Sequence, residues 1–128
     1  MYCIDTNIIV NFLRGDKETC KRFEEVNNDD IFITPLTLCE LFRGAFLSAN
    51  PEIKISLIKE LTDSFNLLEF NEKVCIEYGR KYSKLSKIGK IVENIDIMIG
   101  CFAKVNNLIL VTRNKKHFEN LDIETEIW

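Results

Sequence analysis

The chain alternates between short apolar runs and longer segments whose apolar residues recur with helical spacing. Four apolar runs predict strands, at residues 2–4, 31–34, 67–70 and 108–111, and the alternating segment 123–128 predicts an edge strand. The segments that predict helices are residues 6–13, 17–26, 36–45, 51–65, 72–85, 96–105 and 114–120. Strands that alternate with helices from end to end predict an α/β domain with a mainly parallel sheet. With 128 residues and no linker, we expect residues 1–128 to form a single domain.

Composition narrows the classes of protein to which the chain can belong. Hydrophobic residues make up 46% of the chain and charged residues 29%, which is typical of a globular domain rather than a disordered one. No apolar run approaches the ~18 residues of a membrane span. The first ten residues contain no basic residue before an apolar stretch, so we expect no signal peptide, no membrane partner and a cytoplasmic protein.

The five cysteines and the single histidine, His117, limit the metal chemistry. An odd number of cysteines without a C-x-x-C pair fits neither a disulfide framework nor a zinc site. Four of them have apolar neighbours in the sequence, which predicts buried free thiols. One imidazole excludes a His-rich metal site.

The net charge of −3 does not indicate nucleic-acid binding by the molecule as a whole. Basic residues nevertheless cluster in two stretches, 80–90 and 113–117. We interpret the first stretch as the solvated face of a helix, which is the usual role of a charge run.

Three acidic residues stand out because their neighbours are apolar. Asp5 follows the first predicted strand, Glu40 lies within an apolar helical segment, and Asp96 is flanked by isoleucines. A carboxylate in such surroundings costs free energy unless it is paired or binds a cation. Glu69 also has apolar neighbours, so the pattern is not exclusive to functional acids.

The predicted topology brings these acids to one place. Ligands of open parallel sheets bind beyond the carboxyl ends of the strands. Asp5 ends the first strand, Glu40 lies on the helix after the second, and Asn114 follows the strand at 108–111, while Asp96 can join them from the start of its helix. Carboxylates that repel one another and lack imidazole partners favour Mg²⁺ or Mn²⁺.

Each of these residues also has a purely structural interpretation. Asp5 can cap the following helix, Glu40 can pair with Arg43 three residues on, and Asp96 can favour a helix N-terminus. Asn114 is of a type common in turns and caps. Taken one by one, the residues make a cation site plausible and do not establish it.

Four segments together resemble the PIN-domain ribonucleases, specifically VapC-type toxins. Residues 3–7 (Cys-Ile-Asp-Thr-Asn) resemble the opening motif, and residues 35–44 resemble the second acidic motif, with its Pro, Glu, Leu and Gly. Residues 96–103 resemble the third motif, and residues 110–118 resemble the fourth, with its aromatic after the turn. Each motif is weak alone, but the four occur in order over essentially the whole chain.

The resemblance implies a three-layer α/β/α sandwich with a short, mainly parallel twisted sheet. It also implies hydrolysis of RNA phosphodiester bonds with Mg²⁺ or Mn²⁺ held by Asp5, Glu40 and Asp96. Asn114, counted with the catalytic set, stands where many relatives carry Asp, and its amide binds a metal without adding charge. Ile95 and Gly100 stand where relatives commonly have Asn and Ala.

On this interpretation a cation held by Asp5 and Asp96, with Glu40 bound directly or through water, activates water for attack on the phosphate. The residues expected to support this chemistry are Thr6, Asn7, Glu93 and Thr112, and those expected to approach the RNA backbone are Arg113 and Lys115. We expect single-stranded or looped RNA, such as tRNA loops, because the cleft needs access to a splayed backbone.

The resemblance further implies a small VapB-type antitoxin and a homodimer. Such an antitoxin lays an apolar segment near the active site and often extends a basic residue to the acids. Leu41, Phe42, Phe46 and Leu47 offer a possible apolar surface on one helix, although at least half of them are expected in the core.

Other functions remain open at this stage. The chain can be a PIN-like nuclease of RNA processing without an antitoxin, or a catalytically silent binding module in which Ile95 and Asn114 mark loss of the site. A dehalogenase-like phosphatase is more distant, since Asn7 replaces the second acid of the Asp-x-Asp pattern.

Overall fold

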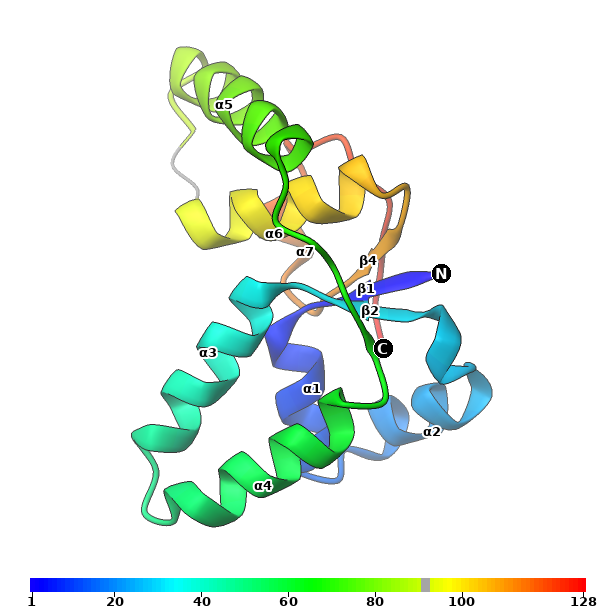
Figure 1. Cartoon of the computed structure of the whole chain (residues 1–128). Coiled ribbons are helices and arrows are strands. Elements are labelled where there is room, and N and C mark those ends of the chain that lie inside the picture. Colours follow the sequence, from blue (N-terminus) through cyan, green and yellow to red (C-terminus); the bar gives the residue numbers. More distant parts are fainter. Residues whose placement is uncertain (91–92) are drawn as a thin grey trace.

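The computed structural model describes residues 1–90 and 93–128, and it places a five-stranded parallel sheet between two layers of helices (Figure 1). The strands are β1 (Tyr2–Ile4), β2 (Ile31–Ile33), β3 (Asn66–Leu67), β4 (Ile109–Val111) and β5 (Thr125–Glu126). Their order across the sheet is β3-β2-β1-β4-β5, and each neighbouring pair is parallel. The mainly parallel α/β sandwich expected from the sequence is therefore confirmed.

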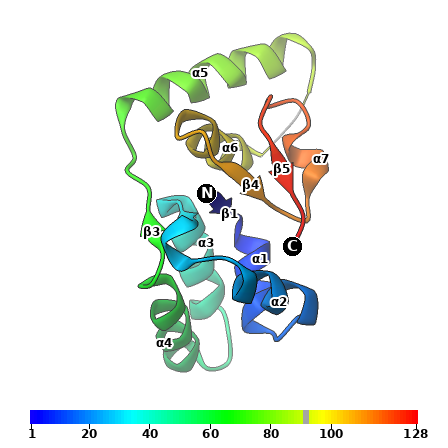
Figure 2. The same cartoon turned by 90° about the vertical axis from the view of Figure 1, so that its right-hand side faces the viewer.

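The helices provide the crossovers that parallel strands require. They are α1 (Thr6–Leu13), α2 (Lys17–Glu25), the 3₁₀ turn η1 (Asn28–Asp30), α3 (Pro35–Phe46), α4 (Pro51–Thr62), α5 (Glu72–Lys87), α6 (Asn94–Val105) and α7 (Lys115–Phe118). Figures 1 and 2 show α5 and α6 on one face of the sheet and α1 to α4 on the other. Among the described residues, no helix combines the length and the apolar character needed to cross a membrane.

The sheet separates two hydrophobic cores because neighbouring strand residues point to opposite faces. Cys3 and Leu110 belong to the core beneath α5 and α6, whereas Ile4 and Val111 belong to the core beneath α1 and α3. All four side chains are fully buried. The central strands β1 and β4 are thus covered on both sides, and functional groups must lie at the ends of these strands.

Several predicted elements extend beyond the observed ones. The helix predicted to reach Phe65 ends at Thr62, whose hydroxyl bonds back to Ile58 O and whose carbonyl accepts from Phe65 N–H. The strand predicted for 67–70 is reduced to Asn66–Leu67, and the edge strand predicted for 123–128 is reduced to Thr125–Glu126. In both edge strands pairing ends where the parallel partner, β2 or β4, ends.

Two expectations about exposure are corrected by the fold. Cys3 and Cys101 are buried, but Cys39 and Cys75 lie on the outer faces of their helices, where neighbouring apolar residues do not cover them. The basic stretch of α5 is mostly solvated as expected, except that Lys81 is buried against Glu77 at 3.8 Å. Pairing with a carboxylate is the usual condition for burying a lysine.

Candidate active site

Asp5 lies where β1 ends and α1 begins, and only 5% of its surface is exposed. One carboxylate oxygen, Oδ1, accepts from the N–H of Thr6 at 2.7 Å, so the residue does cap α1. The other oxygen, Oδ2, accepts from the hydroxyl of Thr112 and from the amide of Asn7, each at 2.7 Å. The capping role and a functional role are therefore compatible, because three donors fix the carboxylate at the carboxyl end of the sheet.

Glu40 approaches this position from α3. Its Oε2 accepts from the hydroxyl of Thr6 at 2.5 Å, which links it to the residue next to Asp5. The alternative partner, Arg43, lies 3.9 Å away with a mostly exposed side chain. An exposed pair at that distance contributes little, so the Thr6 contact is the one that orients Glu40.

Asp96 lies in the first turn of α6, where a negative charge interacts favourably with the helix dipole. Its Oδ2 is 2.8 Å from Nδ1 of His117 in α7. Glu93, the residue that precedes α6, makes no capping bond of its own and adds a further negative charge beside Asp96. The single histidine of the chain thus contacts a candidate metal ligand, a contact that the sequence analysis did not predict.

The three carboxylates influence one another electrostatically. Burial raises the pKa of Asp5, and the charges of Asp96 and Glu40 raise it further, against the hydrogen bonds from Thr112 and Thr6. Burial also raises the pKa of Asp96, with Glu93 and Glu40 contributing, while His117 acts in the opposite direction. A cluster whose charged forms are disfavoured is the arrangement that a divalent cation relieves.

The donor set suits a hard cation such as Mg²⁺ or Mn²⁺, since it consists of carboxylates with an amide oxygen nearby. Within the described residues, however, no three acidic, imidazole or thiol side chains are already placed to hold one ion together. Binding by Asp5, Glu40 and Asp96 at once therefore requires a side chain to rotate. The metal roles of these residues stay predictions.

The segment after β4 completes the surroundings of Asp5. Thr112 is buried, and its hydroxyl accepts from the N–H of Asn114 at 3.0 Å while donating to Asp5. The amide group of Asn7 lies between this segment and Asp5, because its Oδ1 accepts from the N–H of Arg113 at 3.3 Å. Three of the supporting residues predicted from the sequence, Thr6, Asn7 and Thr112, thus surround Asp5, with Asn114 exposed at their edge, whereas Glu93 lies beside Asp96.

The two residues expected to approach RNA differ in how they are engaged. Lys115 is exposed and lines a cavity of about 420 Å³ with Asn114 and His117. Arg113 is exposed and lines the same cavity, but its guanidinium bonds to Asp16 and to the main-chain oxygen of Trp128. Both RNA contacts stay predictions, and that of Arg113 needs its present partners to be released.

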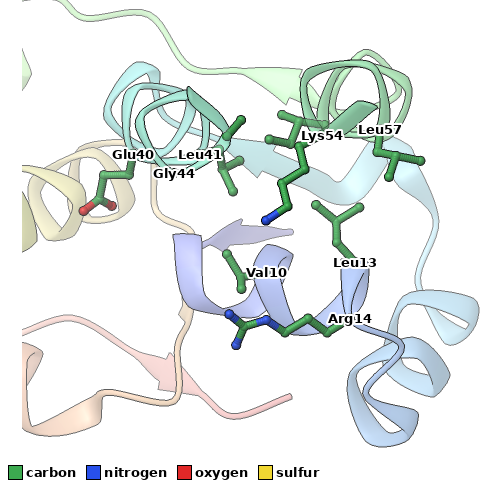
Figure 3. Close-up of a pocket in the computed structure, with 10 residues that line it drawn as sticks. Val10, Leu13, Arg14, Glu40, Leu41, Gly44, Lys54 and Leu57 are labelled. Carbon is green, nitrogen blue, oxygen red and sulfur yellow. The ribbon is translucent and has the colours of Figure 1, made fainter. Parts of the chain in front are cut away.

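A second cavity, of about 250 Å³, lies between α1, α3 and α4 and was not predicted (Figure 3). Its apolar walls include Val10, Leu13 and Leu57, and Figure 3 shows the ammonium of Lys54 reaching across it towards α1. Glu40 stands at one end, so the cavity leads to the acidic cluster. It forms between α1 and the consecutive helices α3 and α4, which are distant from α1 in the sequence, so no local pattern signals it.

One residue of the apolar surface considered on α3 is part of the core. Leu41 is buried and Phe42 is partly covered, whereas Phe46 and Leu47 are exposed at the end of α3. Leu41 shares the inward face of α3 with the buried Ala45, one turn later, whereas Phe46 and Leu47 lie where the helix ends.

The comparisons with known proteins agree with this arrangement. A family model described as the PIN domain matches residues 2–124. Ribonuclease VapC1 of Haemophilus influenzae strain R2866 is 35% identical over 131 residues, covering 100% of this chain and 98% of the relative. The tRNA(fMet)-specific endonuclease VapC of Shigella flexneri is 27% identical over 128 residues, covering 99% of this chain and 97% of that protein.

A solved structure shares the fold as well. VapBC-1 from nontypeable Haemophilus influenzae contains a chain that superposes with a TM-score of 0.89 at 35% identity. The match covers 99% of this chain and 97% of that one. Sequence and structure thus lead to the same group of proteins over essentially the whole length.

Proposed function

Since the chain belongs to the PIN-domain family, we propose that it is a VapC-type toxin, a metal-dependent endoribonuclease neutralised by a cognate VapB-type antitoxin. The observation that carries the proposal is the proximity of three carboxylates at the carboxyl end of the sheet. The charges of Asp96 and Glu40 raise the pKa of Asp5, and the charge of Glu40 raises that of Asp96. The relatives that it matches over its whole length are named ribonuclease and tRNA-specific endonuclease. Such an enzyme meets its RNA in the cytoplasm.

The residues of the site have distinct roles in this proposal. Asp5, Asp96 and Glu40 would hold Mg²⁺ or Mn²⁺, and such an ion would supply a water of lowered pKa and neutralise charge on the phosphate. Thr112 and Asn7 hold the carboxylate of Asp5 in one orientation through its Oδ2. Thr6 holds Glu40 through its hydroxyl. Glu93 adds a negative charge beside Asp96, and Asn114 offers a neutral amide oxygen to the cation.

RNA binds beside the acids on the basic surface formed by α7. The cavity of about 420 Å³ there is lined by four basic side chains, Arg113, Lys115, Lys116 and His117, together with Asn114 and Glu119. Phosphate oxygens attract such groups regardless of base sequence, so this surface fixes the backbone and leaves target choice to the shape of the RNA. A single-stranded loop, such as one in a tRNA, suits this short surface.

We expect the purified protein to cut a tRNA-rich RNA pool when Mg²⁺ or Mn²⁺ is present and to stop when EDTA is added. Sequencing of the new RNA ends measures the cuts and identifies the target. Asp96→Asn, prepared identically, is the control for a contaminating nuclease, because it keeps the size of the side chain and removes its charge. Cuts that persist in this variant or in EDTA, or no cuts at all, would favour the silent binding module.

The antitoxin occupies the cavity between α1, α3 and α4. Its apolar walls suit an apolar segment, and Lys54 and Arg14 at its rim suit an acidic side chain of the partner (Figure 3). At the other end Glu40 suits a basic side chain, which would then lie beside the catalytic acids. A partner segment bound in this cavity therefore covers the acidic cluster.

We also propose that the protein forms a homodimer, and light scattering tests this.

Leu57→Asp should weaken binding of the VapB-type antitoxin by about 100-fold or more in Kd. A carboxylate in the apolar wall must be desolvated when the partner binds, which costs about 2–3 kcal/mol or more. Calorimetry measures the affinity, and RNA cleavage without the partner should be unchanged. The matched control is Ile53→Asp on the same helix, which is exposed and outside the cavity. Equal effects of the two variants would place the partner elsewhere.

A further inference from the structure

The guanidinium of Arg113 is held by groups from two distant segments of the chain. Its Nη2 donates to Oδ1 of Asp16 at 2.6 Å and to the hydroxyl of Thr19 at 3.1 Å. Its Nε donates to the main-chain oxygen of Trp128 at 2.8 Å. A planar guanidinium suits such a fixed set of acceptors, and a lysine ammonium does not. The side chain of Arg113 therefore has one defined position in the protein.

The side chain of Asp16, which accepts from Arg113, is itself held in place by other hydrogen bonds. It caps α2, with its Oδ1 accepting from both the N–H and the hydroxyl of Thr19. These bonds and the Arg113 guanidinium lower the pKa of Asp16 to about 2. The carboxylate thus stays ionised at any ordinary pH, and Arg113 has a permanent partner in the turn after α1.

The main chain of Arg113 extends this anchoring to the catalytic acid. Its N–H donates to Oδ1 of Asn7, and the amide of Asn7 donates to Oδ2 of Asp5. The preceding residue, Thr112, donates to the same oxygen of Asp5. Arg113 therefore connects Asp16, in the turn after α1, with the two side chains that donate to Oδ2 of Asp5, those of Thr112 and Asn7.

Resting on the proposed nuclease function, we propose that Arg113 is a positioning residue, which holds the 112–114 segment so that Thr112 and Asn7 orient Asp5. This role differs from a direct contact with the RNA backbone. An arginine whose charge is compensated by Asp16, and whose guanidinium also bonds to Thr19 and to the main chain of Trp128, would have to break these contacts to turn toward a phosphate. Its effect on the reaction passes through Asp5.

The test compares Arg113→Ala, Arg113→Lys and Asp16→Asn in steady-state cleavage of the RNA that the wild type cuts. A positioning role predicts that Arg113→Ala lowers kcat by about 10–100-fold, the range of such supporting contacts, with KM changed less than about twofold. Asp16→Asn should lower kcat by less, because asparagine loses the charge but keeps an oxygen that can accept from Arg113. The double variant should be no worse than Arg113→Ala, because both substitutions weaken the same link. Arg113→Lys should recover only a small part of the rate.

Calorimetric titration with Mn²⁺ gives a readout that does not depend on cleavage. Arg113→Ala should bind Mn²⁺ about 10-fold or more weakly than the wild type, because Asp5 is no longer held. The matched control is Arg22→Ala, which removes an arginine pair with Glu126 of nearly the same side-chain exposure, 35% and 33% against 34% and 33%. Thermal unfolding of every variant shows which are folded. If Arg113→Ala fails to fold, Asp16→Asn and Arg113→Lys decide the question.

The opposite result is equally clear. A phosphate contact predicts a raised KM for Arg113→Ala, a salt dependence of RNA binding reduced by about one charge, and unchanged cleavage by Asp16→Asn. That pattern, or unaltered Mn²⁺ affinity in both folded variants, would overturn the positioning role. Absence of cleavage by the wild type would instead overturn the proposed nuclease function, while the Mn²⁺ titration would still decide the role of Arg113.

Discussion

Asp5→Asn is expected to lower metal-dependent RNA cleavage by about a thousandfold or more while the protein stays folded. A thousandfold corresponds to about 4 kcal/mol of transition-state stabilisation, which is the scale of a metal ion's contribution to charge neutralisation. Asparagine has the same shape, and its remaining oxygen can still accept from the N–H of Thr6, as Oδ1 of Asp5 does. What it loses is the negative charge that holds the cation and, where the amide nitrogen replaces Oδ2, the acceptor for Thr112 and Asn7.

Without a divalent ion, the stability of this variant should differ little from that of the wild type, because removal of the disfavoured charge offsets the loss of the hydrogen bonds from Thr112 and Asn7 to Oδ2. Burial and the charges of Asp96 and Glu40 raise the pKa of Asp5, so its ionised form is disfavoured in the folded protein. For such a group, the stability present below pH ~4 is lost as the pH rises through the folded pKa. At neutral pH the carboxylate is therefore a cost of folding, and asparagine removes that cost.

Single-turnover cleavage in Mn²⁺ measures the first effect, and thermal unfolding in EDTA measures the second. Mn²⁺ should raise the midpoint of unfolding of the wild type and leave that of Asp5→Asn nearly unchanged. The matched control is Asp63→Asn, an exposed carboxylate in the turn after α4, which should change neither property. Cleavage at the wild-type rate by a folded Asp5→Asn protein would show that Asp5 has no role in the reaction.

The sequence predicted the fold well because its apolar pattern has few alternatives. The runs at β1 and β4 are too short for helices, their last two residues are buried, and each is followed by a polar residue that begins a turn or helix. The ends of α4 and of β3 were less predictable. They depend on the bond from Thr62 to Ile58 and on the pairing of β3 with β2, and neither is visible in local composition.

The candidate site was predicted in part for a similar reason. Acids among apolar neighbours, together with the rule for parallel sheets, identified Asp5, Glu40 and Asp96, which the structure brings into mutual electrostatic influence. The contacts of Arg113 with Asp16 and of His117 with Asp96 escaped prediction. They join residues 97 and 21 positions apart, and such pairings depend on how whole layers pack.

Phe102→Ala should lower the free energy of unfolding by about 3–5 kcal/mol, the usual cost of removing a buried phenyl ring. Phe102 lies on α6 with no exposed surface, and its ring packs edge-to-face against Phe70 with centroids 5.2 Å apart. The neighbours that form this core come from β1, β4, α5 and α7, so the cavity cannot close by movement of one element. Domains of this size are stable by about 5–15 kcal/mol, and the loss is a large fraction of that.

Urea unfolding measures this loss, with Phe46→Ala as the matched control. Phe46 is the same residue type but is 68% exposed at the end of α3, so its removal should change stability by less than about 0.5 kcal/mol. A loss below about 1.5 kcal/mol for Phe102→Ala would mean that α6 is not packed on the sheet as described. Because α6 also carries Asp96, the cleavage activity of Phe102→Ala should fall in proportion to its folded fraction as urea is added. Each molecule that is still folded should cut RNA at the wild-type rate. The effect is thus the reverse of Asp5→Asn, in which the folded molecule persists and its chemistry is lost.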